Sequence, residues 1–319
     1  MSTRARIYYR VAEHVFAVEY SDMTMLSSLG NYTPFEIPLS IMTNDEESIF
    51  TLTIRPSTLL EPDLIATYTH MHTDNTEADM PRIEVYKSNS AQPEDFVWLF
   101  RIAQLADYPI CCELQSNENF TRGIVYISAD CQDVRFCIDN ALMLMYAFRT
   151  ASLMTLEMHA AVVVKPIKRS NESRIKQTAY LFLGHSGTGK STHARQWLQT
   201  FPDSWLLNDD NPILRVMDDG EVWVYGSPWS GKTPCYNNAS ARVGGIVMLS
   251  QAPHNKIRTL SLPEAYAYIL SSASGLKMDS HMADSMYESI KHVITHVKCF
   301  HLECLPNAEA AEVCFRGIV

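Results

Sequence analysis

The feature that most constrains this fold is a glycine-rich turn set between an apolar segment and a helix-compatible segment, at residues 180–195. The segment reads Tyr-Leu-Phe-Leu-Gly-His-Ser-Gly-Thr-Gly-Lys-Ser-Thr-His-Ala-Arg and fits the pattern G-x-x-x-x-G-K-[ST]. Glycine tolerates positive φ and lets oxygen atoms approach the backbone, so successive N–H groups can surround a phosphate. A helix that follows directs its free N–H groups and positive dipole end at the same point. The segment therefore predicts a strand, a phosphate-binding loop and a helix.

The loop is unusual for this chain, which has only 12 glycines among its 319 residues. We expect the Lys190 ammonium to reach the β- and γ-phosphates and the Ser191 hydroxyl to ligate Mg²⁺. The alternative is a tight strand-to-helix turn without a ligand. We interpret the segment as a nucleotide site, with these expected binding residues: Gly184, His185, Ser186, Gly187, Thr188, Gly189, Lys190, Ser191 and Thr192.

The composition narrows the classes of partner. A formal net charge of −10 argues against a general nucleic-acid binder, because phosphate backbones require clustered Lys and Arg. The first ten residues lack the apolar core of a signal peptide, and no run approaches the length of a membrane span. We expect a cytoplasmic protein that binds neither nucleic acid nor membrane. A homo-oligomer is left open.

The pattern changes near residue 136 and predicts two domains. Residues 1–136 form the first, with β-rich segments at 7–20, 48–54, 82–86, 96–102, 108–114, 122–128 and 134–137. We expect this domain to recognise the acceptor or a partner. Residues 137–319 form the second, the nucleotide-binding domain, which opens with a buried helix over 137–156. Its further expected elements are strands at 159–165, 180–183, 204–210 and 245–249, an Asp-Gly hairpin over 212–225, and helices at 262–270 and 281–296.

The eight cysteines contain no C-x-x-C pair and are interpreted as separate buried residues in a reducing compartment. One further group could bind zinc: His292, His296, Cys299, His301 and Cys304. We interpret this group as a helix followed by a strand, which places its side chains on different faces.

Two consecutive carboxylates, Asp209 and Asp210, end the apolar strand that follows the loop helix. One could hold Mg²⁺ while the other accepts the proton of an attacking hydroxyl. The alternative is a solvated strand end or a helix cap. His159 begins the strand before the loop strand and could face the transferring phosphate. Lys232 and Arg242 could close over the phosphates, although each residue taken alone fits a surface charge better.

Three segments resemble, in order, the catalytic domain of HPr kinase/phosphorylase: His-Ala-Ala-Val-Val at 159–163, the loop segment at 181–192, and Leu-Leu-Asn-Asp-Asp at 206–210. That family shares its core with phosphoenolpyruvate carboxykinase. The resemblance implies an α/β fold with an α+β tendency, in which a β-rich N-terminal domain precedes a P-loop kinase domain of HPr kinase/PEP carboxykinase-like architecture. It also implies an antiparallel-rich core and places His159 beside the reacting phosphate.

The resulting functional prediction is an ATP- and Mg²⁺-dependent kinase. It would transfer the γ-phosphate to a hydroxyl of an unknown acceptor, which is a protein, a peptide or a small molecule. Its predicted catalytic residues are Asp209, Asp210, His159 and Lys190, and its predicted metal ligands are Ser191, Asp209 and Asp210. Two alternatives remain: carboxykinase-like phosphoryl transfer to a small carboxylic acid, and a nucleotide-binding switch without catalysis.

Overall fold

The computed structural model describes residues 5–20, 23–38, 47–56, 58–74, 81–89, 95–167, 175–231 and 233–319. The chain divides into two compact units, Met1–Arg149 and Thr150–Val319. This division falls after the long apolar helix, whereas the sequence predicts a boundary before it. In the described part of the chain, no helix has both the length and the apolar character needed to cross a membrane.

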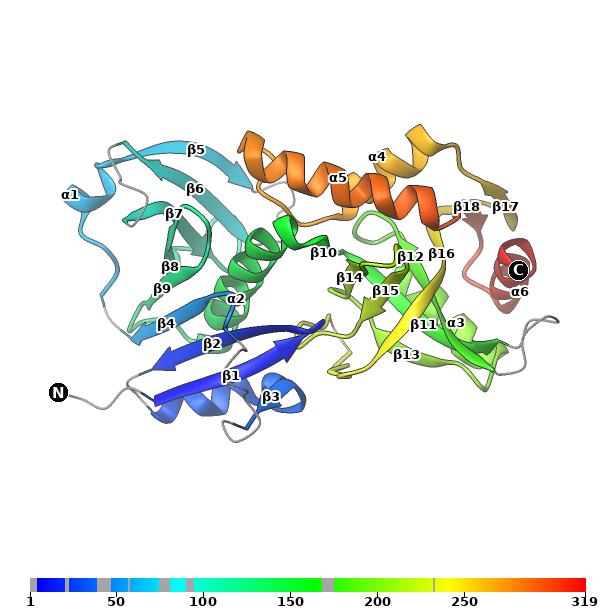
Figure 1. Cartoon of the computed structure of the whole chain (residues 1–319), viewed down its shortest axis with the longest axis horizontal. Coiled ribbons are helices and arrows are strands. Elements are labelled where there is room, and N and C mark those ends of the chain that lie inside the picture. Colours follow the sequence, from blue (N-terminus) through cyan, green and yellow to red (C-terminus); the bar gives the residue numbers. More distant parts are fainter. Residues whose placement is uncertain are drawn as a thin grey trace. The chain divides into compact units, whose positions relative to one another are not determined.

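Unit 1 is built on one sheet of nine described strands in the order β3-β1-β2-β4-β9-β8-β7-β6-β5 (Figure 1). Only the β2–β4 and β4–β9 pairs are parallel. The elements are β1 (Ala5–Val11), β2 (His14–Tyr20), the 3₁₀ segment η1 (Met23–Phe35), β3 (Glu36–Ile37), β4 (Thr51–Pro56), α1 (Pro62–Ile65), β5 (Tyr68–Asp74), β6 (Arg82–Ser88), β7 (Phe96–Ala103), β8 (Ile110–Asn117), β9 (Arg122–Ile127) and α2 (Val134–Thr150).

Helix α2 supplies the aromatic side chains that cover this sheet. The ring of Phe148 lies 5.7 Å from that of Phe100 and 5.0 Å from that of Phe120. The predicted strand at residues 134–137 is wrong, because these residues form the first turn of α2. The carboxylate of Asp133 accepts the backbone N–H of Phe136 at 3.0 Å, which is the capping contact that starts a helix.

Unit 2 contains a second sheet, in the order β10-β14-β15-β16-β12-β11-β13, with β18 paired to β16 and β17 paired to β18. Its hairpin β14–β15 is antiparallel, as the Asp-Gly turn predicts. The elements are η3 (Ala151–Leu153), β10 (Thr155–Glu157), β11 (Ala160–Ile167), β12 (Lys176–Leu183), α3 (Lys190–Thr200), β13 (Trp205–Asn208), β14 (Ile213–Val216), β15 (Val222–Tyr225), β16 (Ser240–Gln251), β17 (Lys256–Thr259), α4 (Leu262–Ser272), α5 (Ser280–His296), β18 (Cys299–Cys304) and α6 (Ala308–Ile318).

Helices cover both faces of the second sheet. Alternate residues of β12 point to opposite faces, so Leu181 packs in the layer with α4 and α5, while Phe182 packs in the layer with α3 and α6. Figure 1 shows α4 and α5 together on one side of these strands. A strand covered on both faces must be apolar throughout, which accounts for the continuous apolar run before the glycine-rich loop.

The predicted architecture of the second half, a P-loop kinase domain of HPr kinase/PEP carboxykinase type, is wrong. The structure is a mixed α/β arrangement with two large, mostly antiparallel sheets, and no P-loop kinase sheet is evident in the described residues. Strand β12 is antiparallel to β11 and parallel only to β16. The antiparallel β11–β12 pairing follows from connection length, because residues 168–175 are too few for the crossover of about a dozen residues that a parallel partner requires.

Candidate functional site

The glycine-rich loop joins the buried end of β12 to α3, as its sequence predicts. Gly187 and Gly189 have φ of +75° and +106°, a region that glycine adopts without strain. A Cβ on Gly184 would lie 3.1 Å from the Thr188 side chain, so a larger residue there would require that side chain to shift. The first N–H of the helical ladder, from His193, donates to the Gly189 carbonyl at 2.8 Å. The loop therefore depends on glycine at each of these three positions.

The side chain of Lys190 folds back over the loop that precedes it. Its exposed fraction is only 8%, and its Nζ donates to the carbonyl of Gly184 at 2.9 Å and to that of His185 at 3.5 Å. Its positive charge acts to lower the pKa of Asp210, so the two charges lie within electrostatic reach of each other. The loop thus holds a buried cation beside an acid from a different strand.

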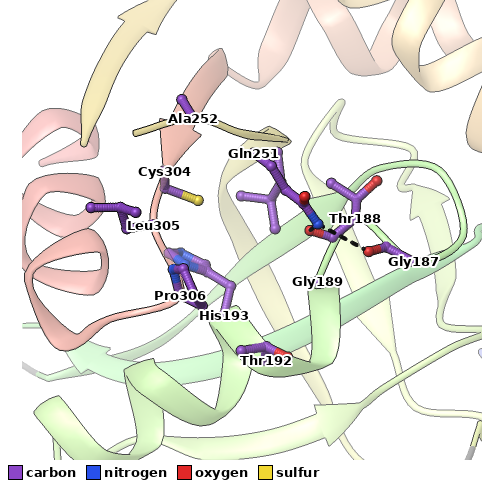
Figure 2. Close-up of a pocket in the computed structure, with 11 residues that line it drawn as sticks. Gly187, Thr188, Gly189, Thr192, His193, Gln251, Ala252, Cys304, Leu305 and Pro306 are labelled. Atoms are coloured by element: carbon purple, nitrogen blue, oxygen red, sulfur yellow. Dashed lines mark hydrogen bonds between the residues drawn. The ribbon is translucent and has the colours of Figure 1, made fainter. Parts of the chain in front are cut away.

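A cavity of about 520 Å³ opens beside the loop, and Figure 2 shows the side chains that line it. Leu249, Cys304, Leu305 and Pro306 form its apolar part. The Gln251 amide crosses to the loop and donates to the carbonyls of Gly187 and Thr188 at 3.3 and 3.4 Å. This volume is in the usual range for a small-molecule site. The cavity offers an apolar pocket directly against the loop backbone.

His193, on α3, forms a wall of this cavity and is electrically neutral. Burial lowers its pKa to about 4. Its Nε2 accepts the indole N–H of Trp197 at 3.0 Å, which leaves the proton on Nδ1. The wall of the pocket next to the loop therefore carries no positive charge from this histidine.

The strand end after β13 is organised by Asn208, which is completely buried. Its amide oxygen accepts the N–H groups of Asp210 and Asn211 at 2.8 and 2.9 Å. Its amide nitrogen donates to the Trp229 carbonyl at 2.9 Å and to the Ser227 hydroxyl at 3.1 Å. This side chain therefore fixes the turn in which the two predicted acids lie.

The two acids have different surroundings. Asp209 is 5% exposed, and its carboxylate accepts the Ser230 hydroxyl at 2.7 Å, the Gly231 N–H at 3.0 Å and the Thr233 N–H at 3.3 Å. Its two oxygens therefore bind Ser230, Gly231 and Thr233. This arrangement gives Asp209 a positioning role.

Asp210 is more accessible, with 34% of its side chain exposed. Its Oδ1 lies 3.4 Å from Nε2 of His159, and its Oδ2 accepts the Asn211 amide at 3.0 Å. Burial is the main cause that raises the pKa of Asp210, and the charge of Asp209 raises it further, while Lys190 opposes both. The structure therefore brings together Asp210, His159 and Lys190.

Glu157 is the acid in this region that sequence reasoning missed. It is 1% exposed, and its Oε1 has no hydrogen-bond partner among the described residues. Burial, and secondarily the charge of Asp210, raises its pKa to about 8. It is therefore mostly protonated at neutral pH. The sequence did contain a signal, because Glu157 is a carboxylate in an otherwise apolar stretch, two positions before His159. It was missed because it falls between the predicted helix over 137–156 and the predicted strand at 159–165.

Arg242 is not brought to the loop. It pairs in register with Thr178, near the end of β12 that lies away from the loop, about 17 Å along the strand from Leu183 at 3.3 Å per residue. Its guanidinium forms an ion pair with Glu221 at 3.1 Å. Lys232, the other predicted mobile cation, lies outside the described residues.

The remaining loop residues face outward. Ser191 is exposed in the first turn of α3, and Thr192 lines the cavity. His185 and Ser186 line a second cavity of about 490 Å³, together with Gln251, Tyr268 and His301. The loop thus has cavities beside it and exposed hydroxyl groups at the helix start.

The C-terminal histidines and cysteines do not form a metal centre in the described part of the chain. His292 and His296 stack on α5 with ring centres 5.9 Å apart, while His301 lies against Ser250 at 2.9 Å. A different group has converging ligand atoms: Cys111, Cys112 and Cys137 of unit 1.

Comparisons with known proteins give a different relationship from the expected one. No protein-family model matches this chain. A "Putative phosphoenolpyruvate synthase regulatory protein" of Shewanella frigidimarina (strain NCIMB 400) is 25% identical over 186 residues, which cover 56% of this chain and 63% of that protein. The match thus spans less than two thirds of the relative's length.

The assignment to the HPr kinase/phosphorylase family is therefore wrong, because the similarity found is to a phosphoenolpyruvate synthase regulatory protein. The misleading signals were the Gly-Lys-Ser triplet and the Asp-Asp pair. Both are short, and the same site chemistry recurs on unrelated folds. The chain is similar to a protein whose name describes regulation of an enzyme.

Proposed function

We propose that unit 2 binds ATP and Mg²⁺ and transfers the γ-phosphate to a hydroxyl of a protein acceptor, an enzyme of the phosphoenolpyruvate synthase class. One observation carries the proposal: a glycine-rich loop holds the buried ammonium of Lys190 within electrostatic reach of Asp210. The name of the similar Shewanella protein favours a protein acceptor over a small molecule.

The loop suits a chain of phosphates. Its glycines leave the backbone accessible, and Lys190 supplies a positive charge that such a ligand needs. The apolar part of the adjoining cavity, which includes Leu249, Leu305 and Pro306, suits a nucleobase. Phosphates on the loop and a base in the cavity account for both features together.

The residues available to Mg²⁺ are oxygen donors, which this ion prefers. They are the Ser191 hydroxyl and the Asp210 carboxylate, while the oxygens of Asp209 already accept three hydrogen bonds. When bound, Mg²⁺ neutralises charge on the phosphates. Lys190 contributes to the same neutralisation from the protein side.

Asp210 is the proposed general base. Its carboxylate is partly exposed and its pKa is raised by burial, so it can accept a proton from an acceptor hydroxyl more readily than an ordinary aspartate. His159, at 3.4 Å, orients this carboxylate. Glu157 stays protonated below its pKa of about 8 and so adds no second negative charge beside Asp210.

The proposal is tested by measuring the transfer of labelled γ-phosphate from ATP to purified phosphoenolpyruvate synthase. We expect Mg²⁺-dependent labelling by the wild-type protein and a loss of at least about a hundredfold in Lys190→Ala, because a preorganised charge is removed. Lys291→Ala, which changes an exposed lysine on α5, is the matched control and keeps full activity.

Binding is measured separately by thermal shift. With free ATP at about 100 times Kd, the wild type should gain about 2.7 kcal/mol and Lys190→Ala much less. Labelling that is unchanged in Lys190→Ala would refute the proposed site. Binding with no labelled synthase would refute this acceptor.

A second candidate is a nucleotide-dependent switch without catalysis. The observation in its favour is that the carboxylate of Asp209 already accepts three hydrogen bonds, so Asp210 would serve both metal binding and proton transfer. This candidate predicts ATP binding, ATP-dependent association with the synthase and no labelled product.

A further inference from the structure

Four cysteines of unit 1 converge from three separate segments. The Sγ atoms of Cys111, Cys112 and Cys137 all lie within 4.8 Å of one another. Cys137 Sγ lies 3.7 Å from Cys111 Sγ and 3.4 Å from Cys131 Sγ. Cys111 and Cys112 belong to β8, Cys131 to the connection after β9, and Cys137 to the first turn of α2.

A β-bulge makes this convergence possible. Consecutive residues of a regular strand point to opposite faces, so adjacent cysteines should not meet the same partner. In the β7–β8 pair, Ile102 faces Cys112 and the next residue, Ala103, faces Ile110, which leaves Cys111 as the extra residue. A bulge re-aims the side chain of its extra residue, and here both thiols reach the same point.

Three of the four cysteines are shielded from water, and hydrogen bonds join the segments that carry them. Cys112 and Cys137 are completely buried, and Cys111 is 9% exposed. Cys131 is partly exposed and adjoins this group through Cys137, and in the 128–133 turn its N–H donates to the Ser128 carbonyl at 3.0 Å. The turn is joined to β8 by the Ser128 N–H, which donates to the Cys111 carbonyl at 2.9 Å.

We propose that Cys111, Cys112, Cys131 and Cys137 bind one zinc ion. A tetrahedral site with Zn–S bonds of about 2.3 Å has S···S separations of about 3.8 Å. The separations of 3.4 and 3.7 Å are close to this value and far longer than the roughly 2.05 Å of a disulfide.

Binding involves no change of oxidation state. Four sulfur–zinc bonds form, and the four thiol protons are released to solvent. The Cys111 thiol gives up its hydrogen bond to the Ile102 carbonyl, which is 3.3 Å long. The ion would tie the bulged strand β8, the 128–133 turn and α2 into one cross-link of unit 1.

The test measures metal content in the full chain, purified with a thiol reductant and without a metal-affinity column. We expect about one zinc per chain in the wild type and less than about a tenth of that in Cys112→Ser and Cys137→Ser. Cys314→Ser removes an equally buried thiol of unit 2 and is the matched control, in which the protein should keep its zinc.

A second measurement keeps the proposal testable if the serine variants fail to fold. Wild-type protein stripped of metal under reducing conditions should bind Co²⁺ with the intense near-ultraviolet charge-transfer band of thiolate ligands, and Zn²⁺ should abolish this band. Zinc addition should also raise the unfolding temperature. Wild-type protein with no metal, with iron in place of zinc, or with a Cys131–Cys137 disulfide would overturn the assignment.

Discussion

Each unit has a buried glutamate in its sheet, and the two carboxyl groups differ in their hydrogen-bond partners. Glu113 of unit 1 is fully buried, and its carboxylate accepts Nε–H of Arg101 at 2.8 Å and the Leu60 N–H at 2.6 Å. Glu157 of unit 2 is equally buried, but one of its oxygens has no hydrogen-bond partner in the described residues.

This difference indicates that Glu113 stabilises the fold, whereas Glu157 belongs to a region suited to chemistry. A buried carboxylate that is ion-paired and hydrogen-bonded has partners that offset the cost of its burial. A buried carboxyl without partners is kept protonated, and perturbed acids of this kind concentrate at functional sites. Glu157 also lies near Asp210, and Lys190 acts on Asp210 in turn, whereas Glu113 is surrounded by its own sheet. The site is therefore expected in unit 2.

The largest expected effect concerns Asp210, the accessible acid of this region. Asp210→Asn should lower phosphoryl transfer by about 10²–10⁴-fold, or about 3–5 kcal/mol of activation free energy, because the proton acceptor is lost. ATP binding, followed by thermal shift, should persist. Asp218→Asn, in the exposed β14–β15 turn, is the control. Full transfer by Asp210→Asn would remove the base from the proposal.

The next largest effect is expected from removing the ion pair between Glu113 and Arg101 in unit 1. Glu113→Gln should lower the free energy of unfolding by about 2 kcal/mol, because Arg101 loses its closest carboxylate while remaining largely buried. Glu84, at 3.4 Å from Arg101, limits the loss. Urea denaturation measures the change, and phosphoryl transfer at low temperature should stay at the wild-type rate. An unchanged midpoint would mean that this ion pair contributes nothing.

A smaller effect is expected of Glu157 on the pH dependence of stability. Its folded-state pKa of about 8 exceeds the ordinary value of 4.5, so the folded state binds more protons between these values. Stability should therefore fall as pH rises through this window, and Glu157→Gln should remove that part of the slope. Between about pH 6 and 7 the two proteins should diverge by about 1 kcal/mol.

Asp210 contributes a residual slope of the same sign, because its pKa is also raised. Denaturant unfolding of both proteins at several pH values measures the difference. Parallel stability curves for the wild type and Glu157→Gln would show that Glu157 is ionised in the folded protein.

The smallest effect is expected for Arg242, which lies away from the loop. Arg242→Ala should change the free energy of unfolding by less than about 0.5 kcal/mol, because its partner Glu221 and Arg242 itself are both substantially exposed. Phosphoryl transfer should be unchanged in the same labelling assay. A large loss of transfer would mean that Arg242 reaches the nucleotide after all.

Local patterns predicted local structure where the physics is short-ranged. The Asp-Gly turn produced the β14–β15 hairpin, and the helix expected at 281–296 is α5 with nearly the same bounds. The β1–β2 hairpin was missed as a separate pair, because its turn uses Ala12 and Glu13 at φ of +46° and +67°. Such turns normally carry Gly or Asn, so nothing in the composition marked this one.

The sequence by itself determined the glycine-rich loop, its strand and its helix, because the permitted φ of glycine and the start of a helix depend on neighbouring residues alone. Only the tertiary structure decided which charges meet there. It placed Asp210 near Lys190 and directed the carboxylate of Asp209 to a loop. It also left Oε1 of Glu157 buried with no hydrogen-bond partner among the described residues. It also brought Cys111 and Cys112 together with Cys137 at a bulge in β8. Strand direction, register and burial are long-range properties, and they set charge and ligand geometry.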